Sequence, residues 1–203
     1  MERTKVLVAC ASKMGSTAEI ADALAERLTA AGLDVDRRAV DGVRDVDAYQ
    51  AVVLGSAVYM GRWRPEAVAF LRRSASDLAR RQVWLFQSGP LDGSTEREDI
   101  PLPKRVAAHA DAIGIRGFVT FGGRIDAEHP AGCMARRMVD GGLGKDFRDF
   151  DRVRAWADAV ATELGADLFV LLENGARVGP GWLDRLARAL AADPARGLAG
   201  PSP

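Results

Sequence analysis

Residues 5–32 read KVLVACASKMGSTAEIADALAERLTAAG and join two different patterns. Residues 5–11 are apolar at nearly every position, which is typical of a strand buried on both faces of a parallel sheet. Behind them, Ile20, Leu24 and Leu28 recur four apart and form one stripe along a helix, and a glycine follows at the stop position. The stretch therefore predicts a strand, a tight turn and a helix.

The same alternation of short apolar runs and longer helical patterns continues along the chain. Further strands are predicted at residues 33–40, 51–55, 82–87 and 116–121. Helices are predicted from Pro65 onward, over about 103–113 and over about 151–164. This order predicts the α/β class, with a doubly wound sheet of five parallel strands and helices on both faces.

Composition excludes several classes of protein. The chain has 203 residues, 48% of them hydrophobic, and its 28 Lys and Arg balance its 28 Asp and Glu. A neutral chain is a poor candidate for nucleic-acid binding or for a polybasic membrane anchor. No apolar run reaches the roughly 20 residues of a spanning helix, and no export signal is visible, so the cytoplasm is the expected compartment. With two Cys and two His, we expect no metal site.

The pattern changes near Gly165. Residues 1–165 hold the five predicted strands and are expected to form one domain. Residues 166–203 contain a further strand at 167–172 and a helix from Pro180 to about Ala192. A stretch of this length is too short to build a hydrophobic core of its own. We therefore interpret it as a C-terminal strand-helix extension and not as a second domain.

In an open α/β sheet, ligands bind beyond the carboxyl ends of the strands, so the loops there are the candidate sites. The first loop offers backbone N–H groups at a helix start together with three hydroxyls, and these can hold a phosphate without a salt bridge. The alternative is an ordinary helix N-cap. The predicted phosphate-binding residues are Ser12, Lys13, Met14, Gly15, Ser16 and Thr17.

The loops after the third and fourth strands reach the same edge. The loop after the third strand carries the aromatic rings of Tyr59 and Trp63 in a turn that we expect to be exposed, and such rings suit a planar ligand. Alternatively, Trp63 folds over the edge of the sheet as a lid. The loop after the fourth strand offers backbone and side-chain hydrogen-bonding groups to a ligand. The alternative is that this loop is a plain Gly/Pro turn. The residues predicted to contact the ligand are Ala57, Val58, Tyr59, Met60, Gly61 and Trp63, then Ser88, Gly89, Pro90, Asp92 and Gly93.

Three segments, residues 9–21, 55–63 and 144–150, resemble flavodoxin-domain proteins, with the menaquinone-dependent protoporphyrinogen oxidases as the most similar branch. The resemblance covers about residues 4–165 and implies a flavodoxin-like sheet with strand order 2-1-3-4-5. It also implies a noncovalently bound FMN, with its phosphate in the first loop and its isoalloxazine ring between the other two. Residues 167–198 resemble a fragment of family 2-type glycosyltransferases, but Gly175 replaces the metal-binding Asp, so no glycosyl transfer is expected.

The resulting hypothesis is an FMN-binding flavodoxin-like redox protein that passes electrons or oxidises or reduces a small organic substrate. A menaquinone-dependent protoporphyrinogen oxidase-type enzyme and a flavin-free interaction module are the alternatives. The expected partner is a redox protein or a small molecule such as a quinone or a porphyrinogen. No side chain is nominated as catalytic, because the flavin would carry the chemistry.

Overall fold

The structure is a computed structural model and describes residues 3–89, 100–125, 136–137, 139–143 and 145–165. The described residues up to Leu164 belong to one compact unit. The strand and helix predicted between residues 166 and 203 lie outside the described residues.

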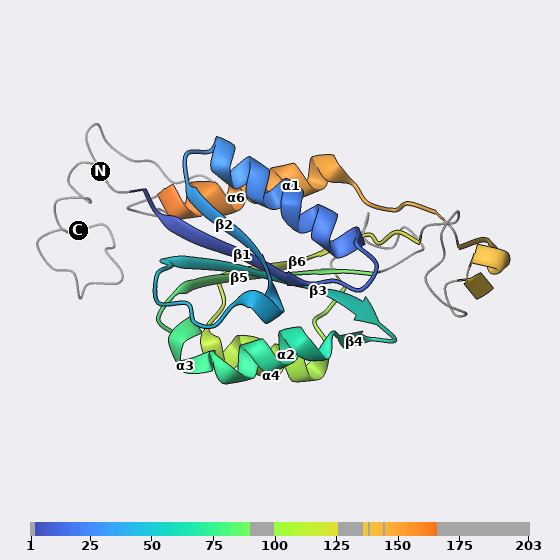
Figure 1. Ribbon diagram of the computed structural model, residues 1–203, viewed down its shortest axis with the longest axis horizontal. Helices are drawn as coiled ribbons and strands as arrows, with labels where there is room; N and C mark the ends of the chain where they lie inside the picture. Colours follow the sequence, from blue (N-terminus) through green and yellow to red (C-terminus); the bar gives the residue numbers. More distant parts are fainter. Residues whose placement is uncertain (1–2, 90–99, 126–135, 138, 144, 166–203) are drawn as a thin grey trace, which may run out of the picture. The chain divides into compact units, whose positions relative to one another are not determined.

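A parallel sheet forms the centre of this unit, with the strands in the order β2-β1-β3-β5-β6 (Figure 1). This order matches the predicted doubly wound arrangement of five strands. A sixth strand, β4, pairs antiparallel with β3 and was not predicted. The strands are β1 (Lys5–Ala11), β2 (Asp34–Ala39), β3 (Ala51–Tyr59), β4 (Arg62–Trp63), β5 (Gln82–Ser88) and β6 (Gly117–Phe121).

Helices cover both faces of the sheet (Figure 1). Helices α1 (Ser16–Ala30) and α6 (Phe150–Gly165) lie on one face. Helices α2 (Pro65–Arg73), α3 (Ala75–Leu78) and α4 (Lys104–Ile113) lie on the other. A 3-10 turn, η1 (Val40–Gly42), follows β2, and a π-helical turn, η3 (Val139–Leu143), precedes α6. Every helix in the part of the chain that the structure describes is too short or too polar to cross a membrane.

Two hydrophobic cores result, because successive side chains of each strand point to opposite faces. On β1, Val6 packs into the core under α1 and α6, whereas Leu7 packs into the core under α2 and α4. Gly55 of β3 lies beside Phe86 of β5 in the strand register, and a Cβ at Gly55 would overlap the Phe86 ring. A side chain at position 55 is therefore excluded by the packing of the core.

The largest difference from the predicted elements is the length of β3. The strand was predicted over 51–55 but continues to Tyr59, so Ala57, Val58 and Tyr59 are strand residues and do not belong to a loop. The chain then reverses at Met60 and Gly61 and returns as β4. Both turn residues have positive φ, 50° and 71°, as a two-residue hairpin of the primed type requires.

Candidate functional site

The turn from β1 into α1 leaves the helix start without a side-chain cap. Gly15 is the N-cap residue, with φ of 85°, and no side-chain hydrogen bond satisfies the first amides of α1. A positive φ is easy only for glycine, so Gly15 sets the path of the turn. The alternative interpretation of this loop, in which a serine caps the helix, is wrong. The free amides and the positive end of the helix dipole remain available to an anion.

Two hydroxyls in the same turn also lack partners. The Oγ atoms of Ser12 and Ser16 are buried and form no hydrogen bond. A buried hydroxyl without a partner costs about 1–3 kcal/mol. Such a cost is commonly retained where a ligand supplies the missing partner, so these atoms mark the turn as a candidate anion site.

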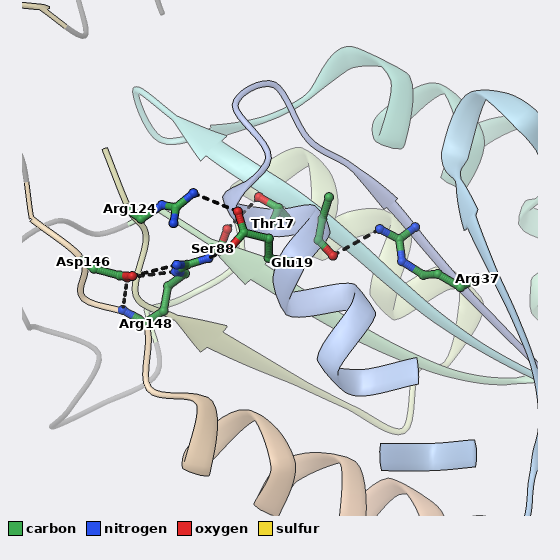
Figure 2. Close-up of polar contacts among 8 residues, drawn as sticks. Thr17, Glu19, Arg37, Ser88, Arg124, Asp146 and Arg148 are labelled. Atoms are coloured by element: carbon green, nitrogen blue, oxygen red, sulfur yellow. Dashed lines mark hydrogen bonds and ion pairs between the residues drawn. The ribbon is translucent and has the colours of Figure 1, made fainter. Parts of the chain in front are cut away.

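Thr17 occupies a different environment from the two serines. Its side chain is only 1% exposed, and Thr17 Oγ1 shares a hydrogen bond of 2.7 Å with Ser88 Oγ at the end of β5 (Figure 2). This bond joins the first candidate loop to the third. Because one hydroxyl donates to the other, only one of the two hydrogens is free to bind a ligand.

The hairpin between β3 and β4 forms the second candidate region. Tyr59 is 39% exposed and Met60 is 88% exposed. The ammonium group of Lys13, from the first loop, lies 5.8 Å from the centroid of the Tyr59 ring. Burial of part of the side chain raises the pKa of Tyr59, so its phenol stays neutral at physiological pH. Tyr59 therefore offers an uncharged ring beside the predicted phosphate loop.

Trp63 does not lie in an exposed turn, and that expectation is wrong. The side chain is 4% exposed and packs in the core under α2 and α4. Its indole Nε1 donates a hydrogen bond of 2.9 Å to Gln87 Oε1 of β5. The side-chain amide of Gln87 in turn donates to Thr120 Oγ1 of β6 at 3.0 Å. Trp63 thus fixes the hairpin to the sheet, and Tyr59 is the aromatic residue of this region that remains accessible.

The third loop begins at Ser88 and Gly89. A Cβ at Gly89 would lie 2.8 Å from the carbonyl oxygen of Val58, so the glycine allows this loop to approach the end of β3 closely. The two segments predicted to flank a planar ligand are therefore neighbours. Three further predicted residues, Pro90, Asp92 and Gly93, lie outside the described residues.

Comparison with known proteins identifies the family of the chain. The flavodoxin domain profile matches residues 7–140. The chain belongs to the flavodoxin domain family. No curated protein matches the sequence.

Solved structures show the same fold. Oxidised flavodoxin 2 from Bacillus cereus is 22% identical, with a TM-score of 0.54 over 79% of this chain and 99% of its own. A flavodoxin from the domain Archaea is 13% identical, with a TM-score of 0.53 over 80% of this chain and 100% of its own. Rubredoxin:oxygen oxidoreductase from Desulfovibrio gigas is 16% identical, with a TM-score of 0.54 over 80% of this chain but only 37% of its own.

An ion-pair network lies beside the first loop of this flavodoxin domain (Figure 2). Glu19, one turn into α1, accepts hydrogen bonds from Arg124 at 2.8 Å and from Arg148 at 2.6 Å. Arg148 also binds both carboxylate oxygens of Asp146, at 2.8 and 2.6 Å. A Cβ on Gly15 would lie 3.8 Å from Glu19 Oε1, which places the network against the turn.

The network was not predicted from the sequence, because Arg124 and Arg148 are 105 and 129 residues from Glu19. The only signal was the resemblance noted for residues 144–150. The Arg148 side chain is 4% exposed, and it pairs with two carboxylates, Glu19 and Asp146, that are each partly exposed. The two guanidinium and two carboxylate groups cancel, so the network positions the segment before α6 without adding net charge to the turn.

The network predicts a dependence of stability on pH. The Arg148 guanidinium hydrogen-bonds Asp146 and lowers the pKa of that carboxyl. A lowered folded-state pKa gives stability above the unfolded pKa of about 3.9, and this stability is lost as pH falls through the folded pKa. We expect Asp146→Asn to lower the free energy of unfolding at pH 7 by less than about 1 kcal/mol, because the carboxylate is partly exposed.

The measurement is urea unfolding of the wild type and the variant from pH 7 down to pH 2. The difference in the free energy of unfolding between the wild type and the variant should vanish near pH 2. Asp151→Asn is the matched control, since Asp151 is 92% exposed and its one ion pair among the described residues is with Arg154. If the free energies of unfolding of the wild type and Asp146→Asn differed by the same amount at all pH values, the lowered pKa of Asp146 would be contradicted.

Proposed function

We propose that the protein binds FMN noncovalently and acts as a flavodoxin-like redox protein, passing electrons to a partner protein or to a small organic substrate. The observation that carries this proposal is the pair of buried, unpartnered hydroxyls of Ser12 and Ser16 at the uncapped start of α1. Membership of the flavodoxin domain family supports the choice of flavin.

The donor set of the first loop suits a phosphomonoester. Ser12 and Ser16 would donate hydroxyl hydrogens, and the turn would add backbone N–H groups. Lys13 is exposed in the same turn and adds one positive charge. The neighbouring ion-pair network is neutral, so binding would depend chiefly on hydrogen bonds and on the helix dipole.

The ring site would lie at the edge of the sheet that the end of β3 and the start of the third loop form together. Tyr59 offers a neutral, partly exposed ring, and Met60 and Gly61 form the adjacent hairpin turn. Bound FMN would supply reversible uptake of one or two electrons. The protein would orient the flavin and limit its access to water, and no side chain is assigned a proton-transfer role.

The direct test is the flavin content of the purified protein. We expect the protein to copurify with FMN, or to take it up after gel filtration, with visible flavin absorbance and quenched flavin fluorescence. Protein that stays colourless in excess FMN would instead support the flavin-free interaction module. Oxidation of protoporphyrinogen with a quinone acceptor would then separate an enzyme of the protoporphyrinogen oxidase type from an electron carrier.

Tyr59 provides a test of the ring end of the site. We expect Tyr59→Ala to weaken FMN and riboflavin equally, by about tenfold, because a stacked aromatic contact contributes roughly 0.5–1.5 kcal/mol beyond the burial of its area. Tyr59→Phe should keep the affinity, since the phenol oxygen has no assigned contact.

Fluorescence titration with both ligands measures these effects. Phe118→Ala is the control, because Phe118 is also an exposed aromatic residue but lies on β6. If Tyr59→Ala lowered the affinity for FMN but not for riboflavin, a contact between Tyr59 and the isoalloxazine ring would be contradicted.

A further inference from the structure

A groove of about 740 Å³ is lined by residues of α2 and α4. These two helices lie on the face of the sheet opposite α1 and α6 (Figure 1). It begins at Gly61 in the β3–β4 hairpin and runs between the two helices. Its accessible apolar residues are Pro65, Val68 and Pro103, and the buried side chains of Trp63 and Val106 lie beneath them. The indole N–H of Trp63 is already donated to Gln87, so it is not available to a ligand in the groove.

The side chains around this apolar surface are basic. Arg62, Arg72, Lys104 and Arg105 all line the groove and are exposed. None of the four forms an ion pair with a carboxylate in the described part of the chain. Several other arginines of the unit do have such a partner, for example Arg27, Arg64 and Arg81.

No carboxylate of the described chain lines the groove. Helix α2 carries one acidic residue, Glu66, and its carboxylate is held by Arg64 at 2.8 Å. Helix α4 carries Asp111, which lies outside the lining. Among the residues that the structure describes, no carboxylate therefore neutralises these four positive charges within the groove, although the chain as a whole has a net charge of +0.

We propose that the groove between α2 and α4 binds a small organic polyanion, a molecule with an apolar body and two or more carboxylate groups. The body would contact Pro65, Val68 and Pro103, and the carboxylates would pair with Arg62, Arg72, Lys104 and Arg105. The volume lies within the range of small-molecule sites, about 300–1,000 Å³, which favours a small ligand over the surface of a protein.

This proposal does not depend on FMN. Ser12, Ser16 and Tyr59, which define the proposed flavin site, are absent from the lining of the groove. Gly61 and Trp63 were predicted to contact the flavin, but both line the groove. A ligand in the groove would consequently lie next to the hairpin without occupying the phosphate loop.

Trimesate, a benzene ring with carboxylates on alternate carbons, is a suitable probe. Calorimetry and amide chemical shifts would follow its binding to the whole protein, with and without FMN. We expect shifts concentrated in α2 and α4, and a loss of affinity of about tenfold in Arg72→Gln/Lys104→Gln. The control Arg44→Gln/Lys145→Gln removes the same charge from exposed positions outside the groove and should bind normally.

Four results would overturn the proposal. Equal loss in both double variants, or equal binding of trimesate and inorganic phosphate, would indicate unspecific attraction of anions. Binding that disappears in Ser12→Ala/Ser16→Ala would place the probe in the phosphate loop. Tighter binding of an oligoglutamate peptide, with the same dependence on Arg72 and Lys104, would assign the groove to an acidic partner protein.

Discussion

Replacing both Ser12 and Ser16 with alanine is expected to lower the affinity for FMN by at least about 100-fold, since each hydrogen bond to a charged group contributes roughly 1.5–3 kcal/mol. The two hydroxyls are buried and without partners in the free protein. Their removal therefore should not lower the free energy of unfolding of the flavin-free protein, and could raise it by about 1 kcal/mol because an unsatisfied polar group disappears. Weaker binding without lower stability is the signature of a ligand site.

The measurements are fluorescence titrations with FMN and with riboflavin, together with urea unfolding of the flavin-free protein. Riboflavin lacks the phosphate, so its affinity should be nearly unchanged in the double variant. Ser76→Ala, on the exposed surface of α3, is the matched control. Unfolding at lower urea with unchanged FMN affinity would mean that the hydroxyls have a structural role and that the first loop does not hold the phosphate.

Gly55→Ala is expected to destabilise the protein by about 3 kcal/mol, at the upper end of the usual cost of overpacking a core. The added methyl group would overlap the Phe86 ring. Phe86 is fully buried and packs against Phe121 at a centroid distance of 6.2 Å, so it has little room to move. Elsewhere in an extended strand, replacing glycine with alanine is favourable by roughly 0.5–1 kcal/mol, so the sign of the effect is diagnostic.

Urea unfolding of Gly55→Ala and Gly42→Ala tests this expectation. A Cβ at Gly42 would meet no atom within 4 Å, and Gly42 has no positive φ, so its substitution should be nearly neutral. The double variant Gly55→Ala/Phe86→Leu should be less destabilised than the sum of its single variants, because the smaller side chain leaves space for the methyl group. Additive effects would show that Phe86 is not the source of the strain.

Much of the fold could be predicted because its signals are local. The strand at residues 5–11 has the bounds that its apolar run indicates, and α1 starts at Ser16 as expected. The extension of β3 to Tyr59 was missed because it leads into a hairpin whose first turn residue is Met60, where glycine or asparagine is usual. The turn is held by pairing with β4 and not by its own sequence.

The candidate site was predictable only in part. The positions of Ser12 and Ser16 follow from the turn between β1 and α1, which is encoded within a few residues. The burial of Trp63 depends on its contact with Gln87, 24 residues away, and local sequence cannot show on which side of the sheet an indole will pack. The partners of Glu19 are still farther away in the sequence, so they could not be predicted from residue type or spacing.

The bond between Thr17 and Ser88 has a consequence for the energetics of ligand capture. It joins two residues that are 71 positions apart in the sequence, and it is buried. The entropic cost of aligning the two loops is therefore met during folding and not when a ligand arrives. A molecule that reaches from one loop to the other meets a pre-organised receptor, and more of its contact energy appears as affinity.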